Sequence, residues 1–269
     1  MRTRILTTIV GLPLIVTLIL LGNTVLQFTM LAISLIGLYE FYRAIEDEYK
    51  PVKYLGYGAT VVYFLALNFI EAHNLIFLSL LIITGLMVMV IGYPKYSIMD
   101  IALTIIGILY VSVLFSFIVL IEKTQYGDFW IWLIFLSSWG SDTFAYFAGR
   151  AFGKHKLAPM LSPKKTIEGS IGGMIGAGIL GFLYTIIYTH YKYTILKEYM
   201  VLVVIAVIIA ALISQFGDLA ASAIKRTFNK KDYGNLLPGH GGILDRFDSI
   251  LFVAPVIYIA VVVAEKVIG

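Results

Sequence analysis

Long apolar runs dominate the sequence and limit its fold more than any other feature. A helix needs roughly 20 largely apolar residues to cross a bilayer. Nine runs approach this length, and we expect membrane-spanning helices at 5–22, 25–44, 55–70, 75–92, 101–121, 129–149, 167–188, 201–217 and 249–267. Only 13% of the residues are charged, whereas a soluble domain carries about 25%. The sequence therefore predicts an all-α polytopic membrane protein.

Lysine and arginine are unequally divided among the segments that join these runs. If the N-terminus is cytoplasmic, the outside segments hold only Lys123, Lys192, Lys197 and Lys266 of the 20 basic residues. Cytoplasmic loops carry an excess of Lys and Arg. We therefore expect a protein of the cytoplasmic (inner) membrane with its N-terminus cytoplasmic and its C-terminus external. The net charge of +4 fits contact with anionic lipid headgroups and does not indicate nucleic acid binding.

The distribution of ionisable residues predicts two regions. Residues 1–125, with about five spans, contain few ionisable residues inside the apolar runs, Glu40 being the main exception. Residues 126–269, with about four spans, contain acids in or beside the runs and two polar loops at 150–166 and 218–248. We expect both loops on the cytoplasmic side and the active site facing the cytoplasm.

The first polar loop and the span before it contain candidate site residues. Asp142 lies about two turns from the end of its run, where an acid costs about 3 kcal/mol unless it is paired or solvated. Pairing with Arg150 is the ordinary alternative. In "SPKKTIEGSIGG", Lys164 and Lys165 precede a helix start, and free backbone amides beside lysines suit a phosphate. The alternative for the lysines is a basic juxtamembrane cluster.

Small residues in the following run predict close helix packing. Gly172, Gly176 and Gly178 form a Gly-rich face. Small residues let helix backbones approach one another in membranes. This face is expected to pack either within one subunit or between the two subunits of a homodimer.

The second polar loop begins with an acid at an unfavourable position. Asp218 follows Gly217 at the end of the eighth run, and Lys225 and Arg226 come two turns later. Cations stabilise the C-terminal end of a helix, whereas a carboxylate there does not. The cations are therefore explained by helix stability alone, and Asp218 is not.

The stretch "PGHGGILDRFDS" precedes the last run and joins turn residues to acids. Its candidate site residues are Gly239, His240, Gly241, Gly242, Asp245, Arg246 and Asp248. The glycines allow the backbone to turn tightly and to approach a ligand. If this segment is helical, the two carboxylates, three residues apart, lie on one face. The alternative is a capped loop with a surface salt bridge.

These groups together suit phosphate chemistry. Mg²⁺ is usually held by one or two carboxylates plus substrate phosphates. We expect Asp142, Asp218, Asp245 and Asp248 to hold one or two such ions. Basic residues would then clamp a polyphosphate for in-line displacement. The residues alone predict lipid-directed phosphoryl or nucleotidyl transfer at the membrane–cytoplasm boundary.

Two long motifs resemble one enzyme family. The run Ser222-Ala223-Ile224-Lys225-Arg226, then Lys231-Asp232, then "LPGHGGILDRFDS" resembles the signature of phosphatidate cytidylyltransferases, or CDP-diacylglycerol synthases. "SDTFAYFAGRAFGKHKLAPMLSPKKTIEGSIGG" is similar to the same family, so the likeness covers about residues 137–255. The chain departs from the family at Ala221, where members often carry an acid.

This resemblance implies transfer of CMP from CTP to phosphatidate, giving CDP-diacylglycerol and pyrophosphate, with Mg²⁺, in phospholipid biosynthesis. The expected catalytic residues are Asp218, Asp245, Lys225, Arg226 and His240. The expected substrate-binding residues are Lys164, Lys165, Ser222, Gly239, Gly241, Gly242 and Arg246. We expect the lysines and Arg226 to neutralise phosphates, and His240 with its glycines to shape the nucleotide pocket.

Three other functions compete with this one. A CTP-dependent kinase of a polyprenol or related alcohol would use similar residues but release CDP. A CDP-alcohol phosphotransferase would need a helix with spaced aspartates around DG and AR pairs, which the sequence lacks. A secondary transporter would explain acids within Gly-interrupted helices, but the two halves show no repeat.

Overall fold

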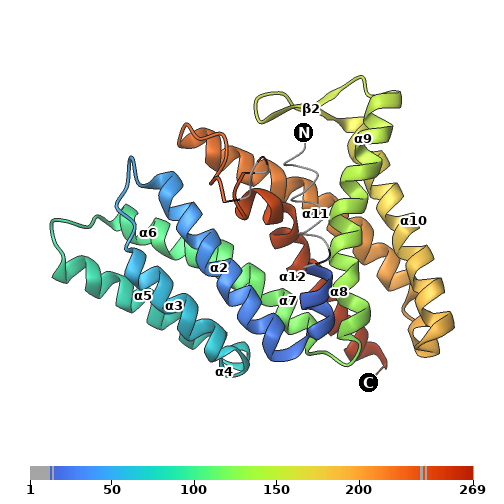
Figure 1. Cartoon of the computed structure of the whole chain (residues 1–269), viewed down its shortest axis with the longest axis horizontal. Coiled ribbons are helices and arrows are strands. Elements are labelled where there is room, and N and C mark those ends of the chain that lie inside the picture. Colours follow the sequence, from blue (N-terminus) through green and yellow to red (C-terminus); the bar gives the residue numbers. More distant parts are fainter. Residues whose placement is uncertain (1–12, 14, 237–238, 240, 269) are drawn as a thin grey trace. The chain divides into compact units, whose positions relative to one another are not determined.

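The computed structural model describes residues 13, 15–236, 239 and 241–268, and its helices confirm the predicted all-α class (Figure 1). The chain divides into two compact units. The first comprises Met1–Val119 and Thr227–Arg246, and the second comprises Leu120–Arg226 and Phe247–Gly269. The segment Thr227–Arg246 therefore packs with the N-terminal unit, although the predicted C-terminal region includes it.

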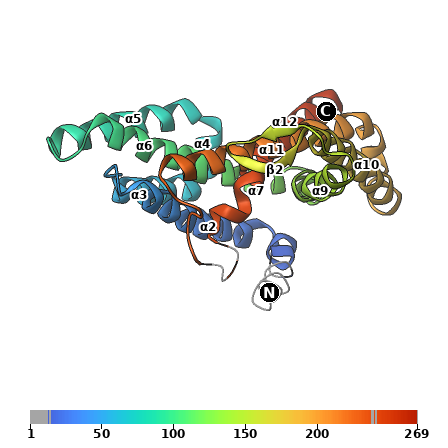
Figure 2. The same ribbon diagram turned by 90° about the horizontal axis from the view of Figure 1, so that it is seen from above.

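The first unit is built around α2. Its elements are α2 (Asn23–Ile45), α3 (Lys53–Leu65), α4 (Leu67–Ala72), α5 (Asn74–Ile91), α6 (Ile98–Gly107), the π-helix η1 (Ile108–Val113) and the first part of α7 (Leu114–Glu122). α2 packs against α3, α6 and η1, and α5 lies beside α6 (Figure 2). The hydroxyl of the buried Tyr42 donates to the carbonyl of Thr104 at 2.8 Å. This bond fixes α2 against α6.

The second unit holds the other elements. They are α8 (Gly127–Phe135), the π-helix η2 (Leu136–Gly140), α9 (Ser141–Phe152), β1 (Lys156–Ala158), β2 (Ser162–Thr166), α10 (Ile167–Tyr191), the 3₁₀-helix η3 (Thr194–Lys197), α11 (Met200–Thr227) and most of α12 (Leu244–Ile268). The helices α9 and α10 lie side by side (Figure 1). Thr166 caps α10, because its hydroxyl oxygen accepts the N–H of Gly169 at 3.1 Å.

Six helices among the described residues are long and apolar enough to cross a membrane, compared with the nine spans that the sequence predicts. They are Thr24–Ile45, Asn74–Ile91, Ile98–Glu122, Ile167–Tyr191, Met200–Thr227 and Leu244–Lys266. Half of the run 5–22 lies outside the described residues. The run 55–70 is divided between α3 and α4 at Ala66. The run 129–149 is helical throughout, but its centre, "SSWGSD", is polar.

Both predicted polar loops contain regular structure, which corrects their bounds. The loop 150–166 includes the end of α9 and an antiparallel hairpin in which Lys156 pairs with Thr166, and Ala158 with Ser162. The loop 218–248 is helical at both ends, because α11 continues to Thr227 and α12 begins at Leu244. The stretch "LAASAIKR" extends α11, since Ala, Leu, Lys and Arg are strong helix formers.

The Gly-rich face of α10 packs within one subunit. A Cβ atom added at Gly172 would lie 2.2 Å from the Cβ of Ala148 on α9, and one at Gly176 would lie 2.1 Å from Cγ of Phe144. Gly178 faces Ile208 of α11 in the same way, at 2.8 Å. These glycines are therefore covered inside the second unit, and a homodimer stays a prediction without support from this face.

The substitution Gly172→Ala should destabilise the second unit. The added methyl group would overlap with Ala148, which has no flexible end to move away, and overpacking costs roughly 1–3 kcal/mol. Thermal unfolding of the detergent-solubilised protein should therefore occur at a lower temperature. Gly58→Ala is the matched control, because a Cβ atom there meets nothing within 4 Å. Equal unfolding temperatures for the two variants would contradict the packing of α9 on α10.

Candidate active site

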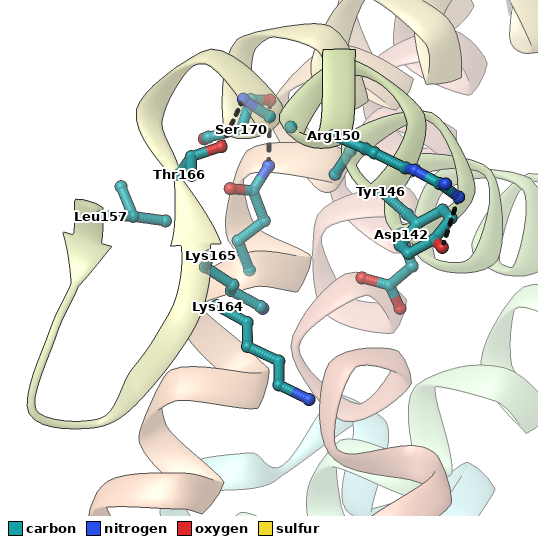
Figure 3. A pocket seen from close by; sticks show the side chains of 12 residues that line it. Asp142, Tyr146, Arg150, Leu157, Lys164, Lys165, Thr166 and Ser170 are labelled. Carbon is teal, nitrogen blue, oxygen red and sulfur yellow. Dashed lines mark hydrogen bonds between the residues drawn. The ribbon is translucent and has the colours of Figure 1, made fainter. Parts of the chain in front are cut away.

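The second unit contains a pocket of about 350 Å³ that charged and apolar groups line together. α9, β2 and α10 form most of its walls (Figure 3). The charged and polar residues that line it are Asp142, Tyr146, Arg150, Lys164, Lys165, Thr166, Ser170 and Gln215. Three cations line this pocket beside a single acid, so the pocket favours an anionic ligand.

The hairpin places the two predicted lysines at the pocket. Glu168, in the first turn of α10, accepts the backbone N–H of Lys154 at 3.0 Å and contacts Nδ1 of His155 at 2.6 Å. The N–H of Ile167 donates to the carbonyl of His155 at 2.9 Å. Glu168 thereby fixes the start of the hairpin to the start of α10, and β2 brings Lys164 and Lys165 to the wall.

An ion pair joins two predicted site residues that lie 53 positions apart in the sequence. Nζ of Lys165 on β2 lies 2.5 Å from Oδ2 of Asp218 on α11. Asp142 on α9 interacts electrostatically with both of these groups, and Figure 3 shows its carboxylate at the pocket. Asp218 lies within α11 and not at its end, and it has a specific cationic partner. Asp142 is close to this pair, and Arg150 instead donates to the hydroxyl of Tyr146 at 3.5 Å.

The other predicted residues of α11 lie on its C-terminal turns. Ser222 is one turn beyond Asp218, and Lys225 follows about one turn later; both are half-buried. Arg226 is exposed. Ser222, Lys225 and Arg226 therefore lie on a helix that continues from a candidate membrane span, and not on a flexible loop.

The start of α12 forms a second polar cluster, in the first unit. Asp245 is only 7% exposed. Its Oδ2 atom accepts the N–H of Tyr233 at 2.8 Å and that of Gly242 at 2.9 Å. Gly239 and Gly241 have φ angles of 79° and 82°, in the left-handed region that favours glycine. Asp245 therefore stabilises the glycine turn, which contains Gly239, Gly241 and Gly242, by joining Gly242 to the backbone of Tyr233. This structural role is additional to any role in chemistry.

Glu40 completes this cluster, and sequence reasoning gave it no function. It is 3% exposed. Its two carboxylate oxygens accept the N–H groups of Ile243 at 3.0 Å and Leu244 at 2.9 Å, at the first turn of α12. A Cβ atom at Gly234 or Gly242 would lie within 2.6 Å of Glu40. Its position as an isolated acid in an apolar run was the one available signal.

The remaining predicted residues differ in position. Asp248 is 9% exposed and accepts the N–H of Ser249 at 2.7 Å. It lies one turn after Asp245 on α12, as the helical spacing predicts. Arg246 is exposed. His240 lies outside the described residues.

The predicted metal ligands fit Mg²⁺ as pairs. Within the described ranges, no three acidic or histidine side chains are close enough to hold an ion. Asp142 and Asp218 interact in the second unit, and Asp245 and Asp248 share a face of α12. Because Mg²⁺ commonly takes one or two carboxylates and completes its shell with water and substrate phosphates, the donor chemistry of either pair is suitable.

Removing the Glu40 carboxylate should destabilise the first unit. Glu40→Ala would leave the N–H groups of Ile243 and Leu244 without their acceptors, and each unsatisfied buried group costs roughly 1–3 kcal/mol. The thermal unfolding temperature in detergent should fall clearly. The unfolding temperature of Glu40→Gln, which keeps one acceptor oxygen, should fall by less.

Glu46→Ala is the control for this series. Glu46 comes directly after the last residue of α2, is exposed, and pairs with Lys53. Such surface pairs contribute about 0–1 kcal/mol. An unfolding temperature for Glu40→Ala as high as that of Glu46→Ala would show that the buried carboxylate does not stabilise α12.

Comparison with known proteins agrees with the resemblance of the two motifs. Residues 2–264 match the model of the Cytidylyltransferase family. A phosphatidate cytidylyltransferase of Staphylococcus saprophyticus is 33% identical over 97% of this chain and 99% of its own length. Those of Staphylococcus haemolyticus and Staphylococcus aureus (strain COL) are each 34% identical over the same shares. The chain therefore belongs to the cytidylyltransferase family, whose members are nucleotidyltransferases.

Proposed function

We propose that this enzyme transfers CMP from CTP to phosphatidate, giving CDP-diacylglycerol and pyrophosphate for phospholipid biosynthesis. The relatives named as phosphatidate cytidylyltransferases match nearly the whole chain. The observation that carries the proposal is the pocket lined by Arg150, Lys164 and Lys165 at the ends of apolar helices. Such a pocket can hold phosphate groups next to a bilayer, where a water-soluble nucleotide can meet a lipid.

In the proposed reaction, a phosphate oxygen of phosphatidate attacks the α-phosphorus of CTP. One P–O bond forms to the lipid phosphate, and the bond between the α-phosphorus and the bridging oxygen breaks to release pyrophosphate. The lipid phosphate is already ionised near neutral pH, so no general base is required. Catalysis then depends mainly on positioning and on neutralising charge.

The cations and glycines have separate roles in this proposal. Lys164, Lys165, Lys225 and Arg226 neutralise the phosphates, while Ser222 and Arg246 bind substrate beside them. The glycine turn at residues 239–242, with His240, shapes the nucleotide pocket. Asp218 holds the ammonium group of Lys165 in place through their 2.5 Å contact.

One or two Mg²⁺ ions are part of the proposal. Asp218 and Asp245 would hold them, supported by Asp142 and Asp248. When bound, such an ion draws charge from the attacked and leaving oxygens. The carboxylates also have structural partners, since Asp245 closes the glycine turn and Asp248 accepts the N–H of Ser249.

We also propose the predicted topology, with nine spans, a cytoplasmic N-terminus and an external C-terminus. The candidate spans α10 and α11 separate the hairpin from the C-terminal end of α11. Two crossings return the chain to the same membrane face, which we assign to the cytoplasm from its excess of Lys and Arg. The helical stretch Gly127–Phe152 would be a further span despite its polar centre.

The position of label from CTP tests the reaction. Purified enzyme with Mg²⁺ and phosphatidate in mixed micelles should transfer the α-phosphate of CTP to lipid and release pyrophosphate, because the attack is at the α-phosphorus. Thin-layer chromatography of lipid products from CTP labelled at either the α or the γ position provides the measurement. Transfer of γ label to a polyprenol would instead support the lipid kinase, and no transfer to any lipid would reopen the transporter alternative.

Asp245→Asn tests the proposed metal ligand separately from the fold. The amide oxygen of asparagine can still accept the N–H groups of Tyr233 and Gly242, so the protein should remain folded and inserted in the membrane. Turnover should fall by about a hundredfold or more, as when a group that stabilises transition-state charge is removed.

Asp47→Asn is the matched control for Asp245→Asn. Asp47 is an exposed acid whose partner, Lys230, lies 2.5 Å away, and this substitution should leave turnover within about twofold, as expected for a surface pair. Near-wild-type turnover of Asp245→Asn would overturn the metal assignment.

A further inference from the structure

Two exposed cations of the second-unit pocket, Arg150 and Lys164, form no ion pair with any residue that the structure describes. Across the described part of the chain, neither Arg150 nor Lys164 takes part in an ion pair, whereas Lys165 pairs with Asp218. The described contact of Arg150 is with a neutral hydroxyl, that of Tyr146. An arginine and a lysine that line one pocket are well suited to a phosphate, which arginine binds through a fork of N–H donors.

Neutral donors lie beside these cations. Thr166 accepts the N–H of Gly169 with its hydroxyl oxygen, which leaves the hydroxyl hydrogen to donate to a ligand. Ser170 also lines the pocket, and its carbonyl accepts a hydrogen bond from Nε2 of Gln215 at 3.3 Å. At about 350 Å³, the pocket is at the small end of the roughly 300–1,000 Å³ range of ligand sites. A phosphate-bearing headgroup fits a pocket of this size.

The helices that form the pocket also expose large apolar side chains. Phe147 on α9 is 62% exposed, and Ile171 on α10 is 53% exposed. Both lie within about one helical turn of pocket-lining residues, Arg150 and Ser170 respectively. At the tip of the hairpin, Met160 is 93% exposed. A ligand with acyl chains can cover such surfaces, whereas a nucleotide has no comparable apolar part.

We propose that this pocket binds the monoester phosphate of the acceptor lipid. Arg150 and Lys164 neutralise the phosphate, the hydroxyl of Thr166 donates to it, and the acyl chains lie along the apolar faces of α9 and α10. Lys165, which pairs with Asp218, also lines the pocket. This inference deepens the proposed function and rests on it, because it assigns one of the two substrates to one pocket.

Kinetics with each substrate varied separately test the assignment. Arg150→Ala and Lys164→Ala should each raise the KM for phosphatidate in mixed micelles about tenfold, the effect of losing a hydrogen bond to a charged group. The KM for CTP should change by less than about twofold. Lys156→Ala is the matched control, because Lys156 is an exposed cation of the same hairpin that does not line the pocket.

Arg150→Lys separates a loss of phosphate binding from a loss of folding. Because it keeps the charge, it should recover part of the affinity for phosphatidate. A rise in the KM for CTP in place of that for phosphatidate would assign the pocket to the nucleotide and overturn the proposal. Unchanged KM values for both substrates would overturn it as well.

Thermal unfolding without CTP separates this inference from the proposed reaction. Dioctanoyl phosphatidate should raise the unfolding temperature of the wild-type protein clearly more than that of Arg150→Ala at the same concentration, and dioctanoylglycerol should raise neither. Equal stabilisation by inorganic phosphate would overturn the lipid assignment. Stabilisation by phosphatidate in a protein that transfers no label would keep the lipid pocket and reject the proposed function alone.

Discussion

The first turn of α12 depends on two buried carboxylates that accept four backbone N–H groups. Glu40 takes those of Ile243 and Leu244, and Asp245 takes those of Tyr233 and Gly242. Removing an ionised acid from water costs several kcal/mol unless its hydrogen bonds are satisfied. Backbone donors provide this compensation, so each acid stabilises the glycine turn and the start of the helix through its own pair of N–H groups.

In the second unit, charged side chains fix the hairpin to the neighbouring helices. The ion pair of Lys165 and Asp218 connects the hairpin to α11, and Glu168 connects the same hairpin to α10. A short two-stranded hairpin is marginally stable by itself. Its attachment at two points gives the pocket wall a defined position, and preorganised charges of this kind contribute most when a transition state accumulates negative charge.

Local patterns in the sequence predicted the helical class, the family, and most of the polar residues that the structure places in the two clusters. Residues 218–227 were missed as helix because the apolar run ends at Gly217, although alanine and lysine extend α11 without apolarity. Glu40 could not be assigned, since its partners lie 203 and 204 positions away. The hairpin was not predicted because residues 150–166 were expected to form a loop, whereas Lys164 and Lys165 lie within β2.

The π-helix η2 sets the direction of the residues that follow it. A π turn holds one more residue than an α turn, so the helix beyond it is rotated by about 100°, the angle between successive residues of an α-helix. Asp142, Tyr146 and Arg150, all in α9, are a stripe at four-residue spacing whose orientation depends on this rotation. The number of residues in a helix usually sets only its length. Here the number of residues before Ser141 also sets a direction, so lengthening or shortening α8 by one residue would turn the side chains of Asp142, Tyr146 and Arg150 away from the pocket.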